Sequence, residues 1–272
     1  MNVTITCRDD FDAFFRAFFA RAVLKPHYQT YFQRSVDRLW LTAREFGLFS
    51  SRYEDLLEIG PALAFLPFLW KEAIAKRVAI FDGESPELIE LGKVYSANGI
   101  EARYGDLFKI FGDRDPGTNR LPFESDRFDG VICWETMEHF NFNPIPFLQE
   151  LLRIVRKGGL VNLTVPNQAK LDLRLHLLLG KSVRTPIDHY FLQMDDRNLM
   201  KYGLHWREYT LVEFCELLRR VGFRIVTARH LNVFMNRESV SPLRAIKRIV
   251  GTLATRLIPS FSALCVVQAQ KD

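Results

Sequence analysis

The stretch Leu56-Leu57-Glu58-Ile59-Gly60-Pro61-Ala62-Leu63-Ala64 decides the fold of this chain. Its first residues predict a short buried strand, and Gly60 predicts a tight turn that opens a helix. Glycine at such a turn lets a ligand approach the main chain, and the free N–H groups of the following helix suit an anionic group. The stretch therefore predicts a nucleotide-binding loop, although Ala62 and Ala64 stand where such loops usually carry glycine.

The bulk properties fit one large globular domain with appendages. The chain has 272 residues, of which 48% are hydrophobic and 25% charged. The first residues show no basic region followed by an apolar run, and no stretch has the length of a membrane span. The four cysteines lack the spacing of a metal site, which favours a reducing compartment. We therefore expect a cytoplasmic protein.

The charge is unevenly distributed. The chain has a net charge of +5, and the part from Lys181 to Asp272 holds 15 Lys/Arg against 8 Asp/Glu. A basic third suggests an anionic partner, although a solvated basic face is the more ordinary explanation. Nucleic acid is not expected, because the chain has no arginine-rich run and no recognisable RNA-binding module. The sequence carries no signal for an oligomeric state.

A helix expected at about 242–257 is both amphipathic and basic. Its apolar stripe lies beside Arg244, Lys247, Arg248 and Arg256. This pattern is more often the packing face of a surface helix, and peripheral contact with a membrane is the alternative.

The rest of the chain alternates strands and helices. The expected strands are Asp55–Gly60, Arg77–Asp82, Ile100–Tyr104, Phe128–Trp134, Leu160–Val165, Phe223–Ala228 and Phe261–Ala269. Helical patterns between most of them, including Pro86–Asn98 and Pro146–Arg156, predict an α/β protein with a doubly wound sheet. Residues 1–50 are expected to form a helical extension or lid, and 51–272 the main domain. Within that domain, 167–209 is an insertion, of a kind that is usually functional.

Acidic residues follow two of the expected strands. Asp82 lies 24 residues after Glu58, close to the spacing of dinucleotide folds, and could accept hydrogen bonds from ribose hydroxyls. Glu84 is the alternative for that role. Asp106, after the third strand, could bind an exocyclic amine of adenine. The order and spacing of these residues carry more weight than any one of them.

These motifs together resemble the class I S-adenosylmethionine-dependent methyltransferases. The resemblance rests on Leu57-Glu58-Ile59-Gly60, Phe81-Asp82, Gly105-Asp106, Leu121-Pro122-Phe123, Phe128-Asp129-Gly130-Val131, Arg156-Lys157-Gly158-Gly159-Leu160 and Thr164-Val165-Pro166-Asn167. It covers about residues 54–270 and implies a seven-stranded Rossmann-like sheet whose last strand is antiparallel. It also implies S-adenosyl-L-methionine as cofactor, with the binding residues Glu58, Gly60, Ala62, Asp82, Asp106 and Trp134.

A second motif follows the fourth strand. If residues 135–140 turn helically, Glu135, Glu138 and His139 share one face. The Glu-x-x-Glu-His pattern resembles small-RNA 2′-O-methyltransferases and ubiquinone-pathway O-methyltransferases, and the RNA enzymes show a histidine like His205. The resemblance implies that Glu135, Glu138, His139 and His205 bind a divalent cation such as Mg²⁺, Mn²⁺ or Zn²⁺. The alternative is that the acidic residues only stabilise a helix start, and that His139 or His205 acts as a general base without metal.

The sequence thus predicts a methyltransferase acting on a hydroxyl of a small molecule, glycan or lipid-linked precursor. Glu135, His139 and His205 are the expected catalytic residues. The alternative is a non-catalytic binding or scaffold protein, because Ala62 and Ala64 could crowd the methionine moiety. A nicotinamide-dependent oxidoreductase is a third, weaker hypothesis, since its loop would need the missing glycines.

Overall fold

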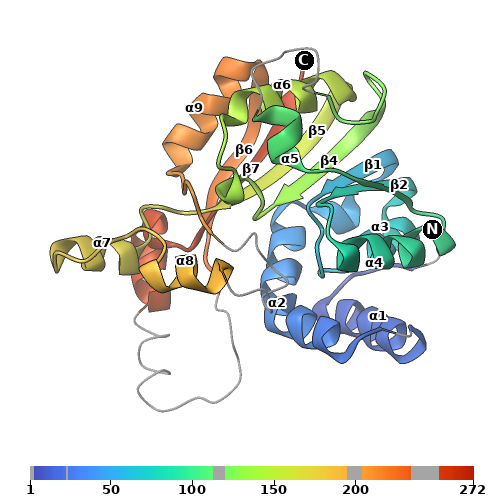
Figure 1. Ribbon diagram of the computed structural model, residues 1–272, viewed down its shortest axis with the longest axis horizontal. Coiled ribbons are helices and arrows are strands. Elements are labelled where there is room, and N and C mark those ends of the chain that lie inside the picture. Colours follow the sequence, from blue (N-terminus) through green and yellow to red (C-terminus); the bar gives the residue numbers. More distant parts are fainter. Residues whose placement is uncertain (1–2, 23, 113–119, 195–203, 234–250) are drawn as a thin grey trace.

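A seven-stranded sheet forms the centre of the protein (Figure 1). The computed structural model describes residues 3–22, 24–112, 120–194, 204–233 and 251–272. The strands are β1 (Tyr53–Ile59), β2 (Ala75–Asp82), β3 (Glu101–Tyr104), β4 (Phe128–Trp134), β5 (Val155–Pro166), β6 (Phe223–Leu231) and β7 (Leu264–Lys271). Their order is β3-β2-β1-β4-β5-β7-β6, and β7 runs antiparallel to both β5 and β6. The predicted sheet with an antiparallel last strand is confirmed.

Helices cover both faces of the sheet. They are α1 (Arg8–Arg21), α2 (Pro26–Glu45), α3 (Leu66–Ala73), α4 (Pro86–Ala97), α5 (Leu107–Phe111), α6 (Pro144–Ile154), α7 (Leu171–Leu178), α8 (Ile187–Gln193) and α9 (Leu211–Val221). Successive strand side chains point to opposite faces, so Leu56 packs in the core beneath α1–α4 and Leu57 in the core beneath α5, α6 and α9. Among the described helices, none is long and apolar enough to cross a membrane.

The phenylalanines of α1 join the N-terminal helices to the main core. Phe15 packs on Phe32 of α2 with ring centroids 4.3 Å apart, and Phe18 packs on Phe68 of α3 at 4.6 Å. These helices and the sheet therefore share one hydrophobic core. This packing brings one face of α2 to the carboxyl end of β1.

The helix predicted at Pro146–Arg156 begins and ends at other residues in the structure, for reasons found in the local sequence. The helix expected at Pro146 begins at Pro144, because the Asn143 side chain accepts a hydrogen bond from the Ile145 N–H. It ends at Ile154, so Gly158 and Gly159 do not close it. Both glycines lie inside β5, where its register with β4 shifts.

Other predictions fall in the second half of the chain. The capping box of Thr210 and Glu213 is confirmed, as is the end of α9 at Gly222, which has φ 118°. The last strand starts at Leu264, because Pro259–Phe261 forms a 3₁₀ turn. Residues 251–257 are helical, and the remainder of the helix expected at 242–257 lies outside the described residues.

Candidate active site

A cavity of about 500 Å³ opens at the carboxyl ends of β1, β2 and β4. In doubly wound folds, ligands bind at this edge of the sheet, where neighbouring connections leave toward opposite faces. All six residues assigned to the cofactor line the cavity: Glu58, Gly60, Ala62, Asp82, Asp106 and Trp134. The structure thus brings them together, and their binding of a cofactor stays a prediction.

Gly60 makes the turn at the end of β1 possible. It has φ 69°, a left-handed conformation that side chains disfavour, and its N–H donates to the Phe81 carbonyl at 2.9 Å. A Cβ atom on Gly60 would lie 2.6 Å from Oγ1 of Thr136. The glycine is therefore required both by backbone conformation and by the close approach of the turn after β4.

Ala62 also has a left-handed backbone, with φ 45°. Its N–H donates to Oδ2 of Asp82 at 2.8 Å, and the Gly83 N–H donates to Oδ1 at the same distance. Burial raises the pKa of Asp82 to about 6, although both hydrogen bonds act in the opposite direction. Glu84, the alternative ribose ligand, is exposed and does not line the cavity. The geometry therefore favours Asp82 over Glu84 as the residue that would bind the ribose.

Glu58 lies fully inside the protein at the end of β1. Its Oε2 accepts a hydrogen bond from the indole Nε1 of Trp70 at 2.6 Å. Burial raises the pKa of Glu58 to about 8, with a further contribution from the nearby charge of Asp82. Glu58 is therefore mostly protonated at neutral pH.

Asp106 and Trp134 complete the predicted cofactor residues. Asp106 caps α5, since its Oδ1 accepts from the Phe108 N–H at 2.9 Å. Trp134 stacks on Phe46 with ring centroids 5.7 Å apart. Its buried Nε1 has no hydrogen-bond partner among the described residues, so this donor is left unsatisfied within the protein.

Glu135 does not share a helical face with Glu138 and His139, and that prediction is wrong. Only Met137–His139 forms a 3₁₀ turn, and Glu135 has a left-handed φ of 49°. Its carboxylate pairs with Nη1 of Arg38 at 3.0 Å. Burial raises the pKa of Glu135, while Arg38 lowers it.

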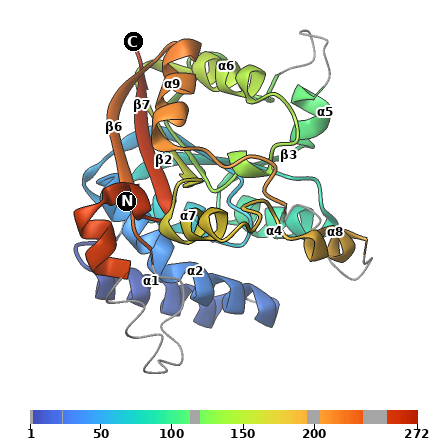
Figure 2. The same ribbon diagram turned by 90° about the vertical axis from the view of Figure 1, so that its left-hand side faces the viewer.

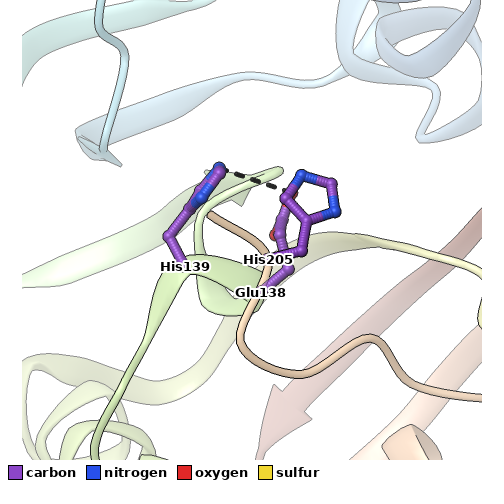
Figure 3. Close-up of side chains that lie close together, drawn as sticks. All are labelled: Glu138, His139 and His205. Carbon is purple, nitrogen blue, oxygen red and sulfur yellow. Dashed lines mark ion pairs between the residues drawn. The ribbon is translucent and has the colours of Figure 1, made fainter. Parts of the chain in front are cut away.

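The other three predicted metal ligands do converge (Figure 3). Ligand atoms of Glu138, His139 and His205 all lie within 4.8 Å of one another. Glu138 is buried, and its Oε2 has no hydrogen-bond partner among the described residues. Burial and the charge of Glu135 raise its pKa well above the usual range. A buried carboxylate oxygen without a partner is costly, and a cation would remove that cost.

Hydrogen bonds fix the tautomers of both imidazoles. Nδ1 of His139 lies 3.0 Å from the Leu204 carbonyl, which can only accept, so Nδ1 carries the proton. Nδ1 of His205 lies 2.8 Å from Oε1 of Glu208. Nε2 of each ring is then left with its lone pair, as a metal ligand or a general base requires.

Two functional candidates escaped the sequence analysis. Arg38 lines the cavity from α2 and contacts Glu135, and its buried Nε has no hydrogen-bond partner among the described residues. The helix α2 carries several arginines, and no local sequence pattern distinguishes Arg38 from the others. Glu208 orients His205 from three residues away, a spacing that could have indicated the pair.

Comparison with known proteins identifies the class. The model of a methyltransferase domain family matches residues 25–228, so the chain belongs to this family. Together with the sheet topology, this defines a class I S-adenosylmethionine-dependent methyltransferase. The family and the antiparallel β7 overrule the oxidoreductase hypothesis.

Solved structures share the fold at low sequence identity. The chain is similar to one in the complex between the Haloferax volcanii Trm112 methyltransferase activator and its methyltransferase partner, with TM-score 0.57, 15% identity, and coverage of 92% of this chain and 99% of that one. A possible histamine N-methyltransferase of Thermotoga maritima is similar with TM-score 0.54 and 14% identity, over 90% of this chain and 95% of that one. An S-adenosylmethionine-dependent methyltransferase of Mesorhizobium loti is similar with TM-score 0.52 and 14% identity, over 81% of this chain and 92% of that one. These likenesses show the fold alone. A search of curated protein sequences found no match.

Proposed function

We propose that this protein transfers the methyl group of S-adenosylmethionine to a hydroxyl group, with assistance from a divalent cation. The observation that carries the proposal is the convergence of Glu138, His139 and His205, with His139 lining the same cavity as the Gly60 loop. A carboxylate and two imidazoles beside a cofactor cavity suit the activation of an oxygen nucleophile.

The cofactor would lie along the carboxyl ends of β1, β2 and β4. Asp82 would accept hydrogen bonds from the ribose hydroxyls, and Asp106 would accept one from the adenine amine. Arg38 is the one arginine or lysine among the described residues that line the cavity. Its guanidinium is therefore the candidate partner for the cofactor carboxylate.

The residues fit a divalent cation such as Mg²⁺, Mn²⁺ or Zn²⁺. Glu138, His139 and His205 would hold it, and Glu135, the expected fourth ligand, is held by Arg38 instead. When bound, the cation would lower the pKa of a coordinated hydroxyl and orient it. Three protein ligands leave positions open for such an acceptor oxygen.

The protein's own part in the reaction is to remove a proton from the acceptor hydroxyl. Without the cation, Nε2 of His139 or of His205 would accept the hydroxyl proton, and burial lowers the pKa of His139, which keeps that imidazole neutral. Where the two imidazoles hold the cation, their lone pairs are occupied and the proton would pass to water instead. The acceptor oxygen then forms a bond to the methyl carbon as the carbon–sulfur bond breaks. The proton ends on the histidine, or on water where the imidazoles hold the cation, and the sulfonium becomes a neutral thioether.

Calorimetry with S-adenosylmethionine, with and without a chelator, tests both cofactors. We expect binding of S-adenosylmethionine, and separately binding of Mn²⁺ or Zn²⁺ that His205→Ala abolishes and His230→Ala leaves intact. Methyl transfer is then measured by incubating the protein with tritiated S-adenosylmethionine and hydroxyl-bearing acceptors and counting the label in the product. Absence of heat with S-adenosylmethionine under every metal condition would favour the non-catalytic scaffold instead. Full transfer activity after chelation would remove the cation from the proposal and leave the histidines as bases.

A further inference from the structure

The helix α7 presents apolar side chains to solvent along its second half. None of its residues is buried, and Leu175, Leu177 and Leu178 are all exposed, Leu178 to 81%. Leu179, which follows directly, is exposed too. An exposed apolar patch of this kind marks an interaction surface.

Two further segments extend this face. In α8 and just after it, Ile187, Phe191 and Met194 are exposed, Met194 to 82%. At the end of the helical residues 251–257, Leu257 is 83% exposed. All three segments lie at the left of Figure 1, and Figure 2, which views that side, shows them across one level of the molecule. We call α7, α8 and residues 251–258 the apolar face.

The described segments that form this face are also basic. Residues 170–194 and 251–258 together contain five Lys/Arg and two Asp/Glu, whereas the whole chain has a net charge of +5. These segments therefore carry a net charge of +3. Among the described residues, Lys181 and Arg256 are exposed beside the leucines.

We propose that the apolar face docks on the surface of an anionic lipid bilayer. Leucine and phenylalanine side chains would enter the boundary between headgroups and acyl chains, while lysines and arginines would contact lipid phosphates. A second copy of the chain fits less well. In a two-fold interface the same surface meets itself, so its excess positive charge would face positive charge.

The face is connected to the cavity through the loop between α7 and α8. Oγ1 of Thr185 donates to the His205 carbonyl at 3.0 Å, and Nη1 of Arg184 donates to the Trp206 carbonyl at 3.3 Å. Trp206 itself lines the cavity. Docking would therefore present the cavity to an acceptor that is held in the membrane. This consequence for the substrate class rests on the proposed function, and the docking surface does not.

Co-sedimentation with vesicles tests the docking without any methyl transfer. The full-length protein is mixed with vesicles of phosphatidylcholine containing phosphatidylglycerol, or of phosphatidylcholine alone. We expect binding to the anionic vesicles, a loss of roughly tenfold for each leucine in Leu178→Ser and Leu179→Ser, and weaker binding in Lys181→Glu. Val212→Ser is the matched control, because Val212 is 76% exposed on α9, outside the face.

Three results would overturn the proposal. One is wild-type protein that stays in solution with the anionic vesicles, or binds phosphatidylcholine alone equally well. Another is a Leu178→Ser/Leu179→Ser variant that binds as the wild type does. The third is analytical ultracentrifugation that shows a dimer which this double variant dissociates, since the face would then join two copies. Circular dichroism and S-adenosylmethionine binding confirm that each variant is folded, and a failure of methyl transfer leaves the vesicle result intact.

Discussion

The backbone N–H of Ala62 donates a hydrogen bond to the carboxylate of Asp82 at 2.8 Å. This bond joins the loop after β1 to the end of β2 and holds Ala62 in its left-handed conformation. A non-glycine residue in that conformation costs about 1 kcal/mol or more. The alanine at this position is therefore tolerated at a cost in backbone strain, and the Asp82 carboxylate helps to offset it.

Replacing Ala62 with glycine should stabilise the protein. We expect Ala62→Gly to raise the free energy of unfolding by about 0.5–1 kcal/mol, because glycine adopts this conformation without a steric cost. Ala64→Gly is the matched control and should lower it by a similar amount, since Ala64 is not among the residues with positive φ. Urea unfolding measures both. Equal effects of the two substitutions would contradict strain at Ala62.

Asp82 should contribute more to cofactor affinity than Glu84. Asp82→Asn should weaken S-adenosylmethionine binding by roughly tenfold or more, because a charge-assisted hydrogen bond to the ribose is lost. Glu84→Gln should leave the affinity unchanged, because Glu84 is exposed and lies off the cavity. Isothermal titration calorimetry compares the two variants, and a stronger effect of Glu84→Gln would reverse the assignment.

Glu208 should tune the metal affinity through His205. Glu208→Gln should reduce the affinity for Mn²⁺ or Zn²⁺ by about 10–100-fold, since the partner of the second imidazole nitrogen orients the ring and raises its basicity. Glu216→Gln, an exposed substitution on α9, should have no effect. The dissociation constants come from titration of metal-free protein. Undiminished metal affinity in Glu208→Gln would show that the pair has only a structural role.

Glu58 should make the stability depend on pH. Its pKa is about 8 in the folded protein and about 4.5 when exposed, so its protonated form stabilises the fold fully below pH ~4.5. That contribution is lost as the pH rises toward 8, by about 3–5 kcal/mol. Glu58→Gln, which cannot ionise, should exceed the wild type in stability at about pH 9 and match it at low pH.

Urea unfolding at several pH values measures this dependence, with Glu54→Gln as the control. Glu54 lies on the same strand, but its side chain is exposed, so this variant should follow the wild type. If Glu58→Gln lost stability with rising pH in parallel with the wild type, the Glu58 carboxyl would not be the group responsible.

Much of the fold could be predicted because the decisive signals are local. The strand Phe128–Trp134 and the capping box at Thr210 each depend on a few neighbouring residues, and both have the expected bounds. Gly60 and Asp82 likewise follow from their positions at strand ends.

The candidate site was less predictable because it depends on contacts between distant segments. Arg38 and Glu135 are 97 residues apart, and no local pattern indicates that they meet. Glu135 leaves the expected helical turn where its backbone adopts the left-handed conformation and its carboxylate meets Arg38. The segment α8 was also missed, since seven residues are too few for a clear helical period.

The contact between Gly60 and Thr136 has a thermodynamic consequence. Thr136 fills the space that a side chain on Gly60 would need, and it immediately precedes the turn that carries Glu138 and His139. The loop after β1 and the turn that carries Glu138 and His139 are therefore closely packed against each other at this point. S-adenosylmethionine and the cation should therefore bind with a coupling free energy, and each ligand should change the affinity of the other by the same factor.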